Sequence, residues 1–313
     1  ANDTVKVKSD YFKNLKLKSL DLKVEDLLPK SSLKEYSGES NSISSIMIDS
    51  IKIAAREFIP SKVSSNDTIV IETSKGTIKL QYYPDIALKH CTNFKKLANS
   101  GFYDMTTFHR VIKNFMVQGG DLLSRDSNRK NDGQGNPGWT IKSEFSDLKH
   151  ERGVLSMARG RSPDSAGSQF FICHNDSYHL DANGRWDDWE DFNDLNDNGK
   201  YDFGEPFEDK SAYTIFGKVI QNIHVLDLIA DTPTDYTVAK IQCYDRIPVG
   251  SSMDKWVKVN DPKTGQNIYS KVPNGMNKTL YMEKLMTSLR SDNPTAPVYI
   301  KKIRVLDGGR TDK

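Results

Sequence analysis

The sequence predicts a mainly β protein, a barrel or sandwich with helical caps. Two β-rich runs within Thr68–Tyr83 are separated by Lys75-Gly76, a hairpin signal. Short apolar runs divided by glycine-rich turns continue to Ile220, and "PVYIKKIRVL" (Pro297–Leu306) forms a last strand. Two segments of this region have helical character, so strands must supply most of the core.

The two expected capping helices lie on either side of the run of strands. The first is "IALKHCTNFKKLANSG" (Ile86–Gly101), which ends at a glycine, a common helix stop. The second is the shorter "IHVLDLIAD" (Ile223–Asp231). We expect both to cover the strands.

The chain is longer than one such domain requires. Residues 1–65 are rich in Lys and Ser and end in a predicted amphipathic helix, Ile43–Phe58, before Pro60. Its apolar stripe either packs on the main domain or binds a partner, which the sequence does not name. We assign the main domain to residues 66–235 plus 294–308, with insertions at 181–210 and 236–293. The second insertion contains a predicted amphipathic helix, Asn277–Ser291.

The composition of the 313 residues, with 36% apolar and 27% charged residues, is typical of a globular protein. No apolar run approaches the roughly 18 residues that span a bilayer. The first ten residues lack the apolar core of a signal peptide, and the missing initiator Met fits a trimmed chain. The three cysteines, Cys91, Cys173 and Cys243, have neither metal spacing nor the even number of a disulfide framework.

The net charge of +2 conceals an asymmetry. Residues 181–209 hold eleven acids and two bases, a local charge of −9, so the rest of the chain carries +11. A basic remainder can favour nucleic acid. The lysines are scattered along the chain, however, so we expect solvated surface charges and no nucleic-acid partner.

Two stretches carry the expected chemistry, "FHRVIKNFMVQGGD" (Phe108–Asp121) and "GVLSMARGRSPDSAGSQFFI" (Gly153–Ile172). Arg110 stands among apolar residues, where it is either one half of a structural salt bridge or a functional cation. Gly119-Gly120 allows close backbone approach or positive φ. Phe170 and Phe171 are adjacent in a strand and must point to opposite faces, one to the core and one to a pocket.

These two motifs, together with "HLD…YTIFGKVI", resemble the cyclophilin family of peptidyl-prolyl isomerases, in family order and over about half the chain. The resemblance implies a closed eight-stranded antiparallel barrel with two capping helices and the site on an outer face. It implies catalysis of rotation about X–Pro bonds in proline-containing polypeptides, which assists folding. It also implies that catalysis needs no cofactor.

The resemblance assigns roles residue by residue. Arg110 matches the arginine that points at the prolyl nitrogen, and Gln118 the glutamine that holds this arginine and the substrate carbonyl. The walls of the proline pocket are Phe115, Met116, Phe171 and Leu180. Ala158 and Arg159 match the edge that binds the peptide backbone, and Gln169 a further pocket residue. Three residues depart from the eukaryotic pattern: His179 replaces a common Trp, Tyr213 a His and Arg159 an Asn. Similar replacements are familiar from bacterial-type members, so activity is expected, but binding of cyclosporin-type inhibitors is in doubt.

The acidic insertion contains "DLNDNGKYDFGE" (Asp194–Glu205), which has the full spacing of a calcium-binding loop. The predicted ligands are Asp194, Asn196, Asn198, the carbonyl of Lys200, Asp202 and Glu205. Pro206 discourages a following regular helix, so the sequence predicts an EF-like loop rather than a full helix–loop–helix hand. We expect structural calcium that stabilises the rim of the active site and takes no part in the chemistry.

A second copy precedes this loop at a period of fifteen, so that residues 181–195 align with 196–210. Its candidate ligands are Asp181, Asn183, Arg185, Asp187 and Glu190. The first ligand position would fall on His179, a poor ligand for calcium, so the copy is either a weaker second site or a decayed one.

Three functions compete for this sequence. The leading one is a prolyl isomerase; its rivals are a non-catalytic module that binds proline peptides and a calcium-dependent structural surface protein. A calcium loop of this kind suits a periplasmic or secreted location, although the sequence does not exclude the cytoplasm. Neither the client nor the oligomeric state can be deduced from the sequence.

Overall fold

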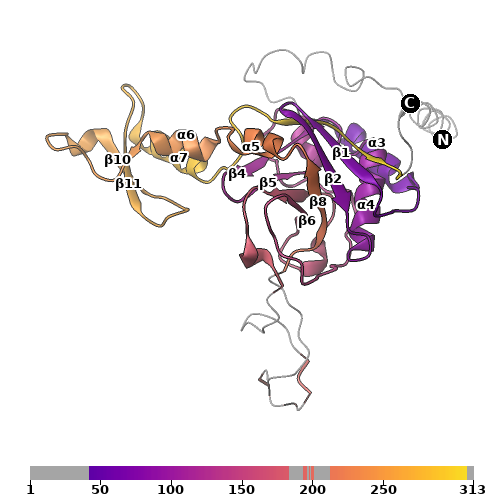
Figure 1. Cartoon of the computed structure of the whole chain (residues 1–313). Coiled ribbons are helices and arrows are strands. Elements are labelled where there is room, and N and C mark those ends of the chain that lie inside the picture. Colours follow the sequence, from indigo (N-terminus) through magenta and orange to yellow (C-terminus); the bar gives the residue numbers. More distant parts are fainter. Residues whose placement is uncertain (1–41, 183–192, 196, 198, 201–211, 309–313) are drawn as a thin grey trace.

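The computed structural model of the chain describes residues 42–182, 193–195, 197, 199–200 and 212–308 (Figure 1). Its centre is a curled nine-stranded antiparallel sheet in the order β3-β12-β1-β2-β8-β6-β7-β5-β4. The strands are β1 Thr68–Thr73, β2 Gly76–Tyr82, β3 Thr106–Thr107, β4 Arg110–Ile112, β5 Met116–Gly119, β6 Val154–Met157, β7 Phe170–Cys173, β8 Ile215–Gln221 and β12 Tyr299–Leu306. The mainly β prediction is therefore confirmed.

The predicted closed eight-stranded barrel is not what the structure shows. Among the described residues the hydrogen-bonded sheet ends at β3 on one side and at β4 on the other. These two end strands are consecutive in the chain and are separated by Phe108 and His109 alone. Strands β3 and β4 follow each other too closely to pair. The two edges of the curled sheet are therefore connected by the covalent chain and not by a ladder of hydrogen bonds.

Two helices pack on the sheet, as the sequence predicted: α4 (Leu88–Asn99) and α5 (His224–Ala230). The main core lies between them and the strands. Phe94 of α4 is at its centre, with ring centroids 5.1 Å from Tyr103 and 5.3 Å from both Phe170 and Phe216. The predicted N-terminal helix is α3 (Ser45–Glu57), which buries Ala55 completely in this core.

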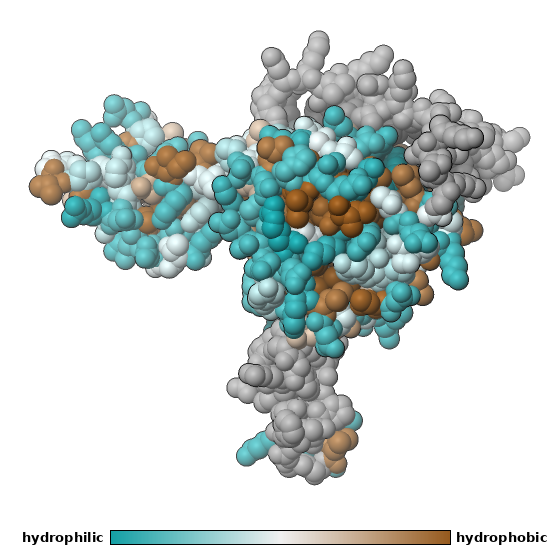
Figure 2. Space-filling model, in the orientation of Figure 1, coloured by the Kyte–Doolittle hydropathy of each residue, from teal (hydrophilic) through white to brown (hydrophobic). Residues whose placement is uncertain are grey.

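The chain between α5 and β12 forms a smaller body beside the main one, in orange at the left of Figure 1 and at the left of the space-filling view in Figure 2. Its elements are α6 Asp235–Ile241, β9 Cys243–Tyr244, β10 Trp256–Asn260, β11 Asn267–Lys271 and α7 Lys278–Leu289, and its three-stranded sheet has the order β10-β11-β9. It has its own apolar core, made of Ala239, Val257, Val259, Ile268, Tyr281, Leu285 and Leu289. From here on the second insertion means residues 235–293, one residue more than the predicted segment, because α6 begins at Asp235.

Short 3-10 turns complete the described fold: η1 Leu122–Arg125, η2 Pro163–Ser165, η3 Tyr178–Leu180 and η4 Met253–Lys255. The acidic insertion leaves the main body after η3 and rejoins it just before β8. Its two ends are held together, because the Tyr213 N–H donates to the Leu180 carbonyl at 3.1 Å. No helix in the part of the chain that the structure describes could span a bilayer.

Candidate active site

The site is built on the hairpin of β4 and β5. Arg110 and Gln118 are paired positions across these two strands, so their side chains lie on the same face. The turn between the strands contains Asn114, a residue with positive φ (+64°). Asparagine tolerates this left-handed conformation better than most residues, which suits it to the tight turn.

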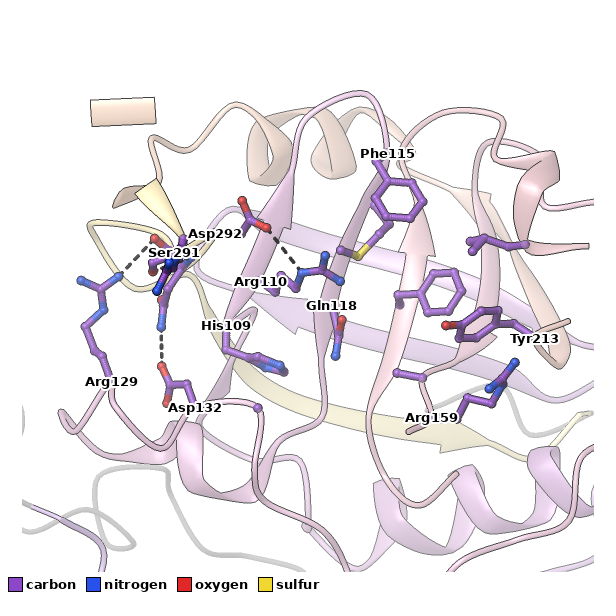
Figure 3. Close-up of a pocket in the computed structure, with 17 residues that line it drawn as sticks. His109, Arg110, Phe115, Gln118, Arg129, Asp132, Arg159, Tyr213, Ser291 and Asp292 are labelled. Carbon is purple, nitrogen blue, oxygen red and sulfur yellow. Dashed lines mark hydrogen bonds and ion pairs between the residues drawn. The ribbon is translucent and has the colours of Figure 1, made fainter. Parts of the chain in front are cut away.

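A cavity of about 470 Å³ opens beside Arg110 (Figure 3). Its apolar wall consists of Phe115, Met116, Ala158, Phe171, Leu180 and Tyr213. These residues come from β5, β7, η3 and the ends of β6 and β8. As strand alternation predicted, Phe170 is buried in the main core while Phe171 lines the cavity. Nine of the eleven residues predicted for catalysis and substrate binding line this one cavity.

Gly120 allows the strand that carries Gln118 to turn away from the site. Its φ is +83°, and a Cβ there would lie 2.5 Å from the Ser168 carbonyl oxygen. The following residue, Asp121, is fully buried and fixes the loop that borders the cavity. Its carboxylate accepts hydrogen bonds from the backbone N–H of Leu123 at 2.9 Å and of Gly133 at 2.5 Å.

Arg159 lines the cavity, as predicted, and its guanidinium is held by contacts within the protein. Its guanidinium lies 4.5 Å from the ring centroid of Tyr213. Its Nε and Nη2 both donate to the Ala212 carbonyl, at 3.0 and 2.9 Å. Tyr213 in turn meets Phe171 edge to face at 5.7 Å. Arg159 therefore supports the aromatic wall, because its donors are directed at its own backbone.

Gln169 and His179 are the two predicted residues that do not line the cavity. Gln169 donates to the carbonyls of Gly133 and Gly135 and accepts a hydrogen bond from Gln118 Nε2 at 3.0 Å. His179 is exposed, with its ring 5.3 Å from that of Phe115. Gln118 was expected to hold Arg110. In the structure its side-chain amide donates to Gln169.

The sequence missed one side of the cavity. This side is lined by His109, Arg129, Asp132, Gly133 and the segment Arg290–Asn293. Asp292 forms an ion pair with Arg110, with its Oδ2 3.5 Å from Arg110 Nε. Because this segment lies at the end of an insertion assigned to a separate body, no local pattern could have placed it beside Arg110.

On this side of the cavity, burial shifts the pKa values of two titratable groups in opposite directions. His109 is almost fully buried, and this burial, with the neighbouring Arg110 charge, lowers the pKa of its imidazole to about 4. Burial also raises the pKa of the Asp132 carboxyl to about 6. His109 is therefore neutral at pH 7.

A buried chain of hydrogen bonds lies behind Phe171. His150 Nδ1 is 2.8 Å from Asp181 Oδ1, and His150 Nε2 is 3.1 Å from Ser156 Oγ. Burial lowers the pKa of His150 although Asp181 opposes this shift. The imidazole stacks on Phe171 at 5.9 Å. Asp181, a candidate ligand of the second calcium copy, is buried here, and its carboxylate accepts a hydrogen bond from the His150 backbone N–H at 2.8 Å.

The predicted calcium loop is described only in part. Gly199 has φ +74°, and its N–H donates to Asp194 Oδ2 at 2.6 Å. Lys200 is also among the described residues. The other predicted ligands, Asn196, Asn198, Asp202 and Glu205, lie outside them, as do Asn183, Arg185, Asp187 and Glu190 of the second copy. No cluster of three or more potential metal ligands occurs in the described part of the chain.

Comparisons with known proteins agree with this geometry. Residues 68–248 match the family model "Cyclophilin type peptidyl-prolyl cis-trans isomerase/CLD". A peptidyl-prolyl cis-trans isomerase of Synechococcus elongatus is 48% identical over 114 residues, which are 36% of this chain and 72% of that protein. One from Acinetobacter baylyi is 36% identical over 171 residues, 54% of this chain and 75% of that protein.

A solved cyclophilin-type isomerase of Cryptosporidium parvum, crystallised in the presence of the dipeptide Ala-Pro, aligns with a TM-score of 0.45 at 24% identity. The alignment covers 76% of this chain and 98% of that one. The assignment rests on the family model, which spans more than half of this chain, and on the relatives in sequence. The chain belongs to the cyclophilin-type peptidyl-prolyl cis-trans isomerases, and it has their enzymatic activity.

Proposed function

We propose that this isomerase acts on exposed X–Pro bonds of protein chains, and so assists their folding, with Arg110 as the group that stabilises the twisted bond. One observation carries the proposal: the Arg110 guanidinium lines a cavity of about 470 Å³ beside an apolar wall that can receive a pyrrolidine ring. Phe115, Met116 and Phe171 would contact the proline ring of the substrate and hold it in place while the carbonyl of the preceding residue rotates.

The chemistry follows from the peptide bond itself. Delocalisation of the nitrogen lone pair resists rotation by about 18–20 kcal/mol. The isomers of an X–Pro bond differ by only about 1 kcal/mol, yet they exchange over tens to hundreds of seconds. A catalyst therefore needs to break no covalent bond and has only to favour the twisted state.

Arg110 supplies this preference. In the planar ground state the prolyl nitrogen is a poor acceptor, because its lone pair is delocalised. In the twisted state the nitrogen becomes pyramidal and basic, so it can accept a hydrogen bond from the guanidinium. An interaction present only in the transition state accelerates the reaction, with each ~1.4 kcal/mol giving a factor of ten.

A protease-coupled assay on an X–Pro peptide tests this role. We expect Arg110→Ala to lower kcat/KM by roughly 100-fold, the usual cost of removing one transition-state donor. Peptide binding should survive, because the apolar wall remains. Arg161→Ala, at an exposed position outside the cavity, is the matched control. Equal rates for Arg110→Ala and the wild type would favour the non-catalytic binding module. Acceleration of a proline-limited refolding reaction tests the folding role.

We further propose that calcium binds at Asp194–Glu205 and stabilises the rim of the pocket. Three observations support this: the full ligand spacing, the positive φ of Gly199 at the turn position, and the hydrogen bond that joins Tyr213 to Leu180 at the base of the insertion. Both of these base residues line the cavity. Bound calcium would offset the repulsion among the acids of this stretch.

Calcium titration followed by chelation tests this second proposal. We expect calcium to raise the melting temperature and to lower KM, and Glu205→Ala to abolish both effects. An unchanged melting temperature and unchanged activity after chelation would contradict it. Because such loops suit the calcium levels found outside the cytoplasm, we also propose a periplasmic or secreted location, which fractionation of the source cells would test.

A further inference from the structure

The second insertion ends in a segment that touches the strand of Arg110 directly. The Asp292 carbonyl accepts a hydrogen bond from the Val111 N–H at 2.9 Å. The Asp292 side chain is 11% exposed, and its carboxylate lies 3.5 Å from Arg110 Nε. Lys263, from the same insertion, forms a second ion pair with this carboxylate. The insertion thus places a fixed negative charge next to Arg110.

The contact is made at a particular atom of the guanidinium. Arginine has five N–H donors in a planar fork, one on Nε and four on the two terminal nitrogens. Asp292 approaches Nε, so the terminal nitrogens remain available on the cavity side, as Figure 3 shows. The Arg110 side chain is 46% exposed, and fixing so long a side chain costs rotamer entropy. Because the contact with Asp292 already restricts the Arg110 side chain, less rotamer entropy is lost when substrate binds.

The anchor is itself held by the main body. Arg129 binds both oxygens of Asp235, at 3.2 and 2.9 Å, and donates to the carbonyls of Asn293 and Pro294, at 3.1 and 2.9 Å. Asn293 Nδ2 donates to Asp132 Oδ2 at 2.5 Å. The two ends of the second insertion are therefore fastened to the loop that borders the cavity. Residues fixed in this way can place a neighbour accurately.

We propose that Asp292 is a positioning residue of the isomerase, which aims the Arg110 guanidinium at the prolyl nitrogen. The second insertion, as the element that supplies Asp292, then belongs to the active site. This inference rests on the proposed role of Arg110. It assigns to Asp292 the holding function that the sequence had given to Gln118, whose amide is bonded to Gln169.

A double-mutant cycle separates positioning from a structural ion pair. We expect Asp292→Ala to lower kcat/KM on the order of tenfold, mainly through kcat, because a misplaced group loses transition-state contact. In an Arg110→Ala background the same substitution should change nothing further. Asp292→Asn, which keeps an oxygen acceptor for Nε, should recover part of the rate. The Nε–H resonance of Arg110 should shift in Asp292→Ala.

Asp254→Ala is the matched control. It removes an acid from the same insertion that lies outside the cavity and accepts a hydrogen bond from the Ser252 hydroxyl. Thermal unfolding of each variant shows whether it is folded, and if Asp292→Ala is not, Asp292→Asn is compared in the two backgrounds instead.

Two outcomes would overturn the inference: an unchanged kcat/KM in folded Asp292→Ala, or an equal fall in the presence and absence of Arg110. Full activity of Arg110→Ala alone would instead contradict the proposed function, so the two failures can be told apart.

Discussion

Tyr213 shows how a single replacement is accommodated in the pocket wall. The resemblance to the family placed a histidine at this position and an asparagine at Arg159. In this chain the tyrosine ring lies between the Arg159 guanidinium, 4.5 Å away, and the Phe171 ring, 5.7 Å away. Such a cation–π contact contributes about 0.5–2 kcal/mol. The two replacements therefore support each other, and neither leaves a gap in the wall.

His109 precedes Arg110 and makes a pH prediction possible. Its folded-state pKa of about 4 lies below the usual value of 6.5, so the unfolded chain binds the additional proton between these values. The free energy of unfolding must then rise with pH from about 4 to 6.5, by up to about 3 kcal/mol from this residue. We expect His109→Gln to remove this rise in urea unfolding measured at several pH values.

Asp132 provides the matched comparison, because its shift has the opposite sign. Its folded-state pKa of about 6 exceeds the usual 3.8, so the folded protein binds the additional proton. This residue lowers the free energy of unfolding as pH rises from 3.8 to about 6, a window that overlaps that of His109. Asp132→Asn should therefore make the free energy of unfolding rise more steeply with pH, whereas His109→Gln should make it rise less steeply. The same change of slope in both variants would refute the assignment.

At the scale of elements, Lys95 joins helix α4 to the first and last strands of the sheet. Its side chain is fully buried, with Nζ 2.7 Å from Asp67 and 2.6 Å from Asp307. Burial alone would lower the pKa of Lys95, but the hydrogen bonds to these two carboxylates outweigh it and raise the pKa. Asp67 precedes β1 and Asp307 follows β12, so one cation connects three elements.

Lys95→Met should be strongly destabilising, because it leaves the buried Asp67 carboxylate without its cation. Breaking a buried pair in this way costs about 3–5 kcal/mol. Adding Asp67→Asn should recover part of the loss by removing the isolated charge. Urea unfolding of the single and double variants measures both effects. If the double variant is less stable than Lys95→Met, the isolated charge is not the cause.

At the scale of the whole molecule, the main body and the second insertion are joined by polar contacts. The second insertion has its own apolar core and reaches the main body at its two ends, through Arg129, Asp132 and Arg110. Bodies linked in this way can open separately. We expect the insertion to unfold locally at a lower free energy than the curled sheet.

Arg129→Met tests this organisation. The variant keeps an unbranched side chain, shorter than that of arginine, but loses the bonds to Asp235, Asn293 and Pro294. Amide hydrogen exchange should become on the order of tenfold faster in α6 and α7, while β1, β2 and β8 keep their protection. The isomerase rate should also fall, since Asp292 loses its support. Equal acceleration of exchange in the main sheet would show that the two bodies unfold as one.

The sequence by itself determined the features that depend on local periodicity and motif spacing. These include the mainly β class, the helices α3, α4, α5 and α7, the opposite faces of Phe170 and Phe171, and most of the apolar pocket wall. The class, the helices and the two phenylalanine faces follow from residues a few positions apart, where backbone geometry fixes which side chains share a face. The pocket wall followed from the resemblance of the two motifs to the cyclophilin family. The motif residues also form a continuous surface once the sheet curls.

Only the tertiary structure decided which distant side chains meet. Asp292 comes beside Arg110 because the second insertion packs back on the main body, and no local pattern encodes that packing. The ends of the sheet are joined by the chain because β3 and β4 are consecutive, a consequence of topology. Arg159 lies over the Tyr213 ring, and Asp181 lies within hydrogen-bond distance of His150, because the fold brings these residues together from separate segments. Contacts of this kind depend on the relative position of whole elements, which packing free energy sets over the entire molecule.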